Sequence, residues 1–519
     1  MTPIRLVSGI FTVGLWTLLS RVLGLARDII LLGTLGTGPV YEAFIVAFRL
    51  PNMFRRFFAE GAFNMAFVPI FSKKLEAEED ATHFMNQAFA GLATILIVLT
   101  LIAQAAMPWL ILALASGFKG QEQFSLAVEF GRITFPYILF ISLAALLSGV
   151  LNAAGRFAES AAAPVLLNIL LVATLLLAGY LGYDVGTALV WSIPLAGIAQ
   201  FTLLYLAARK AGMPVRFVRP RMSKDMRRLI RVAVPAAMAG GVVQLNLLVG
   251  QQVASYFDRA VGWLFTADRL YQLPLGVVGI AISVVLLPDL SRRLKAGDVA
   301  GSRNALSRAG ELALALTVPC AVALVVIPLP IVSVLFERGA ARPEDSRAIA
   351  LAVAVYGAGL PAFVLQKVLQ PIFFARENTR SPFNYAVVAM IANAVLAIGL
   401  APFVGWIASA LATTGAAWVM VVLLVRGTRP MGDIARFDKR FHSRNWRIIF
   451  ASVLMGAVLW PVSQLMWGWL HSDFVRYPAL FLLIAIGSLA YFVAGTVLGA
   501  FTLSDFRNAV SRGNKGATG

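Results

Sequence analysis

Residues 92–115 read LATILIVLTLIAQAAMPWLILALA and contain no charged side chain. A helix needs about 20 predominantly apolar residues to cross the hydrocarbon core of a bilayer. Runs of this kind recur from Val7 to Ala500, and across the 519 residues hydrophobic side chains make up 59% and charged ones 13%. Soluble domains carry about a quarter charged residues, so the sequence predicts an all-α polytopic membrane protein.

About fourteen spans are expected from these apolar runs. Arg21 lies inside the first run, which lacks a small-residue cleavage site, so we predict a retained helix there rather than a signal peptide. The spans are expected near residues 7–35, 40–71, 84–115, 123–154, 161–182, 187–209, 229–257, 262–294, 304–336, 345–376, 382–403, 406–426, 446–469 and 477–500.

Basic residues predict the orientation, because Lys and Arg next to the spans stay in the cytoplasm. With both termini in the cytoplasm, most of the 44 Lys and Arg face that side of the membrane. These residues are divided among many short loops, so no nucleic-acid surface is expected. The basic run at 215–231 is instead expected to meet anionic phospholipids at the cytoplasmic surface.

A weak internal repeat is visible along the chain. VPIFSKKL at 68–75 matches LPDLSRRL at 287–294, and Gly155-Arg156 corresponds to Ala375-Arg376. Parallel repeats of this kind place a substrate site between the two halves. The predicted organisation is an N-lobe at 1–210, a basic cytoplasmic linker at 211–228, a C-lobe at 229–426, a second basic linker at 427–445, two further helices at 446–500 and a cytoplasmic tail at 501–519.

Charged side chains occur within several predicted spans. Each costs at least ~2.5 kcal/mol on insertion scales and normally faces a bundle interior or a wet cavity. Three of the cations, Arg21, Arg27 and Arg55, suit a diphosphate, which Arg binds in bidentate fashion. Pro51 beside Arg49 and Pro274 beside Arg269 are expected to interrupt their helices, a pattern typical of transport sites. The charged residues of these spans are Arg21, Arg27, Asp28, Glu42, Arg49, Arg55, Arg56, Glu60, Asp268, Arg269 and Lys367.

A structural role is the alternative for each of these residues. Arg56 and Glu60 are four residues apart, which favours a local ion pair. For Asp268 with Arg269, partial solvation near the end of the span is the alternative, and for Lys367 the binding and structural roles weigh equally.

Three motifs resemble a known family. They are SRVLGLARD at 20–28, EAFIVAFRLPNMFRRFFAEGAFNMAFVPIF at 42–71 and ADRLYQLPLGVVGIAISVVLLPDLS at 267–291. They are similar to the MurJ (MviN) family of lipid II flippases, in the multidrug/oligosaccharidyl-lipid/polysaccharide (MOP) exporter superfamily, and the resemblance covers nearly the whole chain. It implies two six-helix lobes around a cationic cavity that opens alternately to each side, with a groove for the polyprenyl tail along residues 446–500. The implied cargo is lipid II, the undecaprenyl-diphosphate-linked disaccharide-pentapeptide, moved from the cytoplasmic to the periplasmic leaflet.

The resemblance also implies which residues bind the cargo. A second set of candidates, with less support, consists of Glu42, Arg49, Asp268 and Lys367. The substrate-binding residues implied by the family are Arg21, Arg27, Asp28, Arg55, Glu60 and Arg269.

Ion coupling is the point at which this chain departs from some relatives, which hold sodium through carboxylates in the seventh and eleventh helices. Residues 232–257 and 382–403 contain no carboxylate, which argues against such a site. Neutral oxygens could come from Asn246, Asn393, Thr413 and Thr414. The alternative driving force is the membrane potential, worth ~2.3 kcal/mol per charge per 100 mV.

No cofactor, metal site or catalytic residue is expected. The single Cys320 and the three histidines lack metal-ligand spacing, and the loops lack the base or Asp-rich motif that a transferase for polyprenyl diphosphates needs. A transporter is therefore favoured over an enzyme. The alternatives are an exporter of another polyprenyl-linked saccharide or amphipathic compound, and a non-transporting scaffold for wall synthesis. Expected partners are lipid II, anionic phospholipids, and proteins of cell-wall synthesis and division.

Overall fold

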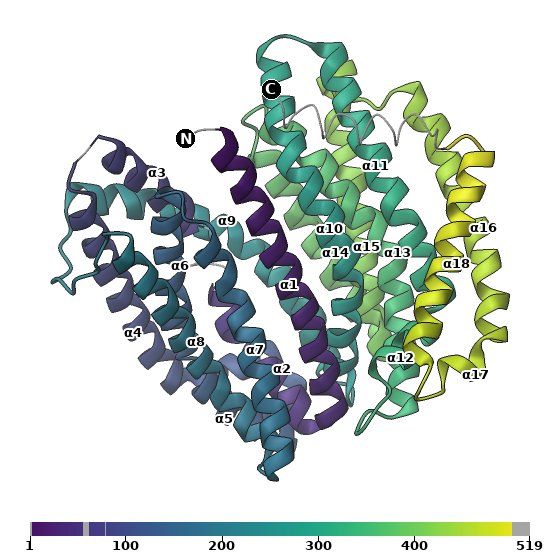
Figure 1. Ribbon diagram of the computed structural model, residues 1–519, viewed down its shortest axis with the longest axis horizontal. Helices are drawn as coiled ribbons and strands as arrows, with labels where there is room; N and C mark the ends of the chain where they lie inside the picture. Colours follow the sequence, from purple (N-terminus) through teal and green to yellow (C-terminus); the bar gives the residue numbers. More distant parts are fainter. Residues whose placement is uncertain (1–2, 56–61, 78, 501–519) are drawn as a thin grey trace. The chain divides into compact units, whose positions relative to one another are not determined.

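The computed structural model describes residues 3–55, 62–77 and 79–500 (Figure 1). Within these ranges the chain forms helices and connecting loops, with no strand. Nine segments of the described residues are long and apolar enough to cross a membrane. The predicted all-α polytopic class is therefore confirmed, while the number of about fourteen spans stays a prediction.

The chain divides into two compact units, one of Met1–Gly262 with Arg338–Arg342 and the other of Trp263–Glu337 with Pro343–Gly519. In the first unit, α1 packs on α7, α2 on α5, α6 on α8, and α9 on α3 and α4. The helices of the first unit are α1 (Pro3–Leu35), α2 (Pro39–Arg55), α3 (Ala62–Glu76), α4 (Ala81–Leu114), η2 (Ser116–Phe118), α5 (Glu122–Thr134), α6 (Tyr137–Ala153), α7 (Ala158–Leu181), α8 (Val185–Lys210) and α9 (Lys224–Ala254).

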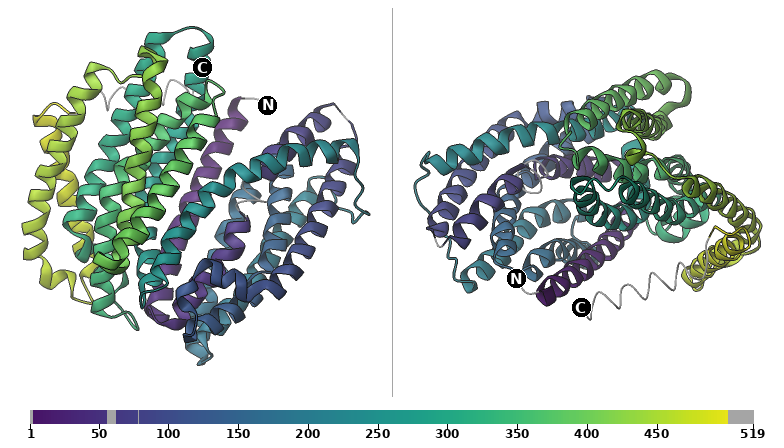
Figure 2. Two further views of the ribbon diagram at one scale, coloured as in Figure 1. Left: turned by 180° about the vertical axis from the view of Figure 1, so that it is seen from behind. Right: turned by 90° about the horizontal axis from the view of Figure 1, so that it is seen from above.

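In the second unit, α11 packs on α13 and α16, α15 packs on α13 and α14, and α16 packs on α18. The last pair, coloured yellow-green and yellow, lies side by side in both views of Figure 2. The helices of the second unit are α10 (Ala260–Lys295), whose first turn belongs to the first unit, α11 (Val299–Val326), α12 (Pro328–Phe336), α13 (Pro343–Phe374), α14 (Arg380–Val404), η3 (Gly405–Ile407), α15 (Ala408–Thr428), η4 (Arg429–Met431), η5 (Asp433–Ala435), α16 (Lys439–Leu465), α17 (Trp467–Leu470) and α18 (Arg476–Val497).

Side-chain caps explain where several helices begin. The Asp80 carboxylate accepts a hydrogen bond from the backbone N–H of His83 at 2.8 Å, and Asp184 does the same for Thr187 at 2.8 Å. These N–H groups belong to the first turn, where no intrahelical acceptor exists. The sequence thus supplies the acceptors that start α4 and α8.

Among the described residues, the predicted spans at 123–154 and 304–336 are each divided into two helices. The span at 123–154 consists of α5 and α6, separated at Pro136, and the span at 304–336 consists of α11 and α12, separated at Ile327. Proline has no backbone N–H and its ring clashes with the preceding turn, so a helix commonly ends before it. Ile327 accordingly leaves the helical region, with φ −125° and ψ 43°, directly before the proline that opens α12.

The predicted interruptions at Pro51 and Pro274 are wrong, because α2 and α10 continue through both prolines. A proline at position 51 leaves the carbonyl of Ala47, four residues earlier, without its helical donor. The hydroxyl of Thr134 on α5 donates to that carbonyl at 3.5 Å. The same hydroxyl lies 3.4 Å from the carbonyl of Gly131, so the neighbouring helix compensates only in part for the lost hydrogen bond.

The predicted lobes differ from the two units at α9. This helix was placed at the start of the C-lobe, whereas it packs on α3 and α4 in the first unit. The end of α9 also lies close to η2, since a Cβ on Gly117 would overlap the backbone of Ser255 just after α9. The lobe boundaries at 1–210 and 229–426 stay a prediction.

Candidate functional site

The charged centre of α1 is an arginine held on two sides. Arg27 donates through Nε and Nη2 to Oδ1 of Asp28, at 3.0 and 2.6 Å, and through Nη1 to Oδ1 of Asn168 on α7, at 3.0 Å. The side chains of Arg27 and Asp28 are 12% and 5% exposed. A guanidinium has five N–H groups, so this arrangement fixes the plane of Arg27 and leaves two donors for another acceptor.

Asn168 is the residue that sequence reasoning missed at this site. It is buried, and its Nδ2 donates to the carbonyl of Ser20 at 3.0 Å and to the carbonyl of Pro164 at 3.3 Å. Its amide therefore joins α7 to α1 on one side and holds Arg27 on the other. A lone amide in the middle of the apolar run at 158–181 was the available signal, because such a group needs partners when buried.

The α2 cations contact polar groups within the first unit. Arg49 donates to the side-chain oxygen of Gln251 on α9, and Gln251 in turn donates to the carbonyl of Leu114 at 3.4 Å. Arg55 donates through Nε to Oδ1 of Asn52 at 3.3 Å. Arg49 thus connects α2 to α9, which favours its structural role.

Glu42 is placed at the start of another helix. Its side chain is 1% exposed and accepts hydrogen bonds from the backbone N–H groups of Val261, at 3.0 Å, and Gly262, at 3.4 Å. These donors lie in the first turn of α10, where a carboxylate is also favoured by the helix dipole. The geometry supports a capping role for Glu42 rather than contact with cargo.

The remaining candidates differ in how far the structure describes them. Asp268 accepts a hydrogen bond from Gln272 one turn later on α10, and the Arg269 guanidinium lies 4.5 Å from the centre of the Phe265 ring. Lys367 is exposed on α13, and Arg21 is half-buried on α1. Glu60 and Arg56 lie outside the described residues.

Metal ligands and cofactor groups were not expected. Over the part of the chain that the structure describes, no group of three His, Cys, Asp or Glu side chains lies together. Asn393, one of the proposed neutral sodium ligands, is buried on α14. The coupling ion stays untested by this geometry.

Comparison with known proteins identifies the family of this polytopic helical chain. A family model described as lipid II flippase MurJ matches residues 32–479. The chain belongs to the MurJ family of lipid II flippases. A probable lipid II flippase MurJ from Rhizobium meliloti (strain 1021) is 42% identical over 518 residues, covering 98% of this chain and 97% of that relative.

Solved structures agree with this family assignment. A structure titled lipid II flippase MurJ, inward closed conformation, has a TM-score of 0.79 at 25% identity and covers 93% of this chain and 98% of that one. An inward-facing multidrug resistance MATE transporter of the MOP superfamily has a TM-score of 0.68 at 14% identity, covering 80% of this chain and 95% of that one. The second likeness shows a common fold alone.

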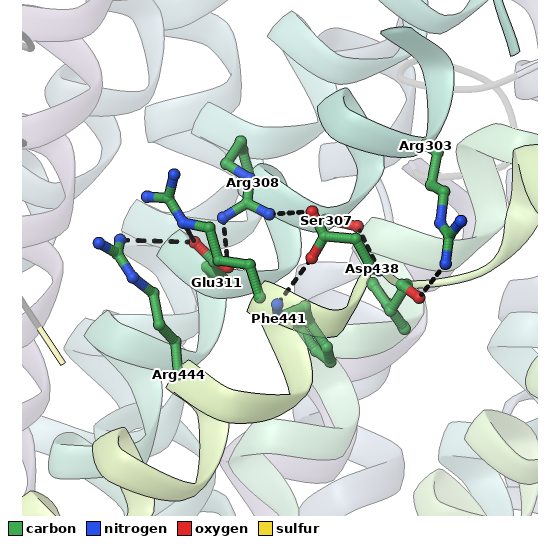
Figure 3. Close-up of polar contacts among 9 residues, drawn as sticks. Arg303, Ser307, Arg308, Glu311, Asp438, Phe441 and Arg444 are labelled. Atoms are coloured by element: carbon green, nitrogen blue, oxygen red, sulfur yellow. Dashed lines mark hydrogen bonds and ion pairs between the residues drawn. The ribbon is translucent and has the colours of Figure 1, made fainter. Parts of the chain in front are cut away.

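An ion-pair network fixes the start of α16, near the end of the region that the MurJ model matches. Glu311 on α11 pairs with Arg308, with Arg444 at 3.7 Å and with Arg440 at 3.8 Å (Figure 3). Arg308 also pairs with Asp438, the residue that caps α16 by accepting from the N–H of Phe441 at 2.7 Å. The predicted linker at 427–445 is therefore bound to α11.

The two C-terminal helices expose apolar faces. Large exposed side chains on α16 include Phe450, Leu454 and Trp460, and those on α18 include Phe481 and Leu489. The faces that meet are closely packed, since a Cβ on Gly487 would lie 2.8 Å from a methyl group of Leu459. The outer faces are compatible with the predicted groove for a polyprenyl tail, which stays a prediction.

Proposed function

We propose that this protein is a flippase that moves lipid II from the cytoplasmic to the periplasmic leaflet of the bacterial inner membrane by alternating access. The observation that carries the proposal is the family match over residues 32–479. This range includes α2 and α10, the helices that carry Arg55 and Arg269. The protein is a transporter, so its side chains need to bind and release cargo without covalent chemistry. It would serve peptidoglycan synthesis, and therefore cell-wall growth and cell shape.

The role assigned to Arg27 follows from its geometry. Asp28 and Asn168 hold the guanidinium in one plane, and two N–H groups stay available for the diphosphate. A charge-assisted hydrogen bond is stronger than a neutral one and gains further strength where water is excluded. Arg21, Arg55 and Arg269 are proposed to share the cargo's charge, with Asp28 and Glu60 limiting the excess positive charge.

Coupling to the membrane potential is proposed in place of a carboxylate-bound sodium ion. The absence of Asp and Glu from residues 232–257 and 382–403 supports this choice. Cargo carrying a diphosphate moves negative charge across the bilayer, and each charge is worth ~2.3 kcal/mol per 100 mV. Anionic phospholipids at the cytoplasmic surface and proteins of wall synthesis and division are proposed as partners, and both termini are proposed to be cytoplasmic.

A second candidate function is export of another amphipathic compound, which the shared fold with a MATE transporter favours. Cationic drugs would require acids to face the cargo, whereas the candidate set here contains more arginines than carboxylates. Anionic lipid-linked cargo suits this charge balance better.

Reconstitution tests the proposal directly. Purified protein in liposomes with a labelled lipid II should increase the fraction of label reached by a membrane-impermeant quencher, and labelled phosphatidylcholine in parallel vesicles should be unaffected. In cells, depletion should accumulate lipid II in the cytoplasmic leaflet. Equal movement of both lipids would indicate nonspecific scrambling, and movement of neither, with the cellular effect retained, would favour the scaffold alternative.

A further inference from the structure

A basic pocket lies at one end of the second unit, between the turn that joins α13 to α14 and the end of α15. Its volume is ≈ 660 Å³, and its polar lining comes from Arg376, Asn378, Ser381, Tyr385 and Arg426. We call it the α13–α15 pocket. It contains none of the residues assigned above to lipid II.

The pocket is held in shape by short-range contacts. Asn378 accepts a hydrogen bond from the backbone N–H of Ser381 at 3.0 Å and donates to the Ser381 hydroxyl at 3.0 Å. Arg376 donates to the carbonyl of Met431 at 3.4 Å, which joins the two sides of the pocket. Each of these contacts lies within one compact unit.

A glycine on α15 makes room for the pocket's aromatic wall. A Cβ on Gly427 would overlap the hydroxyl and ring of Tyr385, so any larger residue there would displace the ring. Tyr385 also packs edge-on against Phe373, with ring centres 6.1 Å apart. The phenol is therefore fixed from two sides while its hydroxyl remains at the pocket lining.

Charge is the pocket's distinguishing property. Within the described ranges, neither Arg376 nor Arg426 forms an ion pair, and no carboxylate lines the pocket. Both guanidiniums are exposed, as are the flanking Arg380 and Arg429. The nearest acid in sequence, Glu377, is exposed in the turn at φ 59° and does not line the pocket.

The internal repeat shows that this charge is specific to the second half. Arg156, the counterpart of Arg376, pairs with Glu159 at 3.5 Å. Three residues after Arg376 the chain carries Thr379 instead of an acid. The same turn is thus neutralised in the first copy and left cationic in the second.

Apolar side chains beside the pocket indicate a lipid. Phe374, Phe383, Val422 and Val425 lie within one turn of pocket residues and are exposed, so acyl chains have a surface next to the two guanidiniums. Basic pockets between helices at the cytoplasmic side of a membrane protein bind anionic headgroups. We propose that the α13–α15 pocket binds the phosphate-bearing headgroup of an anionic phospholipid, with Arg376 and Arg426 as its two cationic contacts.

The test uses the purified full-length protein in neutral detergent, titrated with phosphatidylglycerol or phosphatidylcholine and observed by intact-complex mass spectrometry. Arginines near a membrane surface contribute about 1 kcal/mol each. The double variant Arg376→Gln/Arg426→Gln should therefore bind phosphatidylglycerol about 30-fold more weakly. Arg156→Gln, which removes the paired counterpart in the first copy, should bind as the wild type does.

Two outcomes would overturn the proposal. Equal phosphatidylglycerol binding by the wild type and the double variant would exclude the pocket as the site. Displacement of phosphatidylglycerol by millimolar inorganic phosphate, with no displacement by chloride at equal ionic strength, would identify a soluble phosphate as the ligand instead. Phosphatidylcholine binding unchanged in the double variant would show that it remains folded. Lipid II transport is not the readout, so failure here leaves the flippase proposal intact.

Discussion

Nη1 of Arg27 on α1 donates to Oδ1 of Asn168 on α7 at 3.0 Å, which joins residues 141 positions apart. The same amide donates to the carbonyl of Ser20, about two turns earlier on α1. Asn168 thus contacts both the backbone and the guanidinium of one helix, and the direction of Arg27 depends on it.

Replacing Asn168 by Leu should lower lipid II transport at least tenfold, because Arg27 would keep Asp28 and lose its second fixed partner. Each lost hydrogen bond also removes about 1 kcal/mol of stability. Transport in liposomes and thermal unfolding in detergent would both be measured. The neighbouring, lipid-exposed Ile169→Leu is the matched control, and full activity of the Asn168 variant would exclude a positioning role.

Arg27→Ala and Arg269→Ala should each abolish transport while leaving membrane insertion intact, because each removes a charge-assisted donor from a water-poor site. Arg27→Lys should restore only part of the activity, since an ammonium lacks the planar fork. Complementation of a depletion strain at matched expression is the measurement. Full growth with either alanine variant would remove that residue from the proposed binding set.

Glu42→Ala should lower thermal stability by about 1–2 kcal/mol, because the first-turn N–H groups of α10 would lose their buried acceptor. Glu42→Gln keeps one acceptor oxygen and should lose less. Unfolding curves in detergent distinguish the capping role from contact with cargo. Unchanged stability combined with lost transport would return Glu42 to the substrate-binding set.

Asp184 gives a pH-dependent prediction outside the membrane spans. Hydrogen bonds from the Thr187 side chain and backbone outweigh burial and hold the pKa of Asp184 below its usual value of 3.8. A carboxylate with a lowered pKa stabilises the fold at neutral pH, and this contribution is lost as pH falls through that lowered pKa. The stability difference between the wild type and Asp184→Ala should therefore be constant at neutral pH and shrink as the pH is lowered below 3.8. Asp184→Asn, which retains a neutral cap, should show a smaller pH dependence, and a constant difference for the alanine variant would contradict the assignment.

The predicted topology places residue 340 in the periplasm and residue 436 in the cytoplasm. On a Cys320→Ser background, Ala340→Cys should react with an impermeant thiol reagent in whole cells and Arg436→Cys should not. Arg436 is chosen over Gly432, four residues earlier, because the φ of 76° at Gly432 would strain a cysteine. The reverse labelling pattern would show that the protein has the opposite orientation in the membrane.

Apolar runs were sufficient to predict where most helices lie, because a spanning helix must be about 20 residues long and apolar. They could not predict the break at Ile327, since a proline within such a run either ends a helix or is accommodated by a neighbour. At Pro51 the helix continues, and the nearest compensating donor, the Thr134 hydroxyl, lies 3.5 Å from the Ala47 carbonyl and 87 positions away in sequence. Proline positions alone do not contain this information.

In the candidate site, too, some features could be predicted from the sequence and others depended on contacts between distant helices. The adjacent charges of Arg27 and Asp28 were evident from the sequence, and the structure pairs them. Asn168 required knowledge of which helix lies beside α1. Glu311 was missed because its partners Arg440 and Arg444 are more than a hundred residues away, in a segment predicted to be only a linker.

The network around Glu311 determines what would be lost if the C-terminal helices were removed. Deleting the residues after 436 would remove Asp438, Arg440 and Arg444, so Arg308 and Glu311 on α11 would lose their ion-pair partners at the start of α16. A shortened transporter built from this chain is therefore expected to unfold at a lower temperature than the full-length protein. Because α16 also packs along α11 and α18, these two C-terminal helices are not a detachable module.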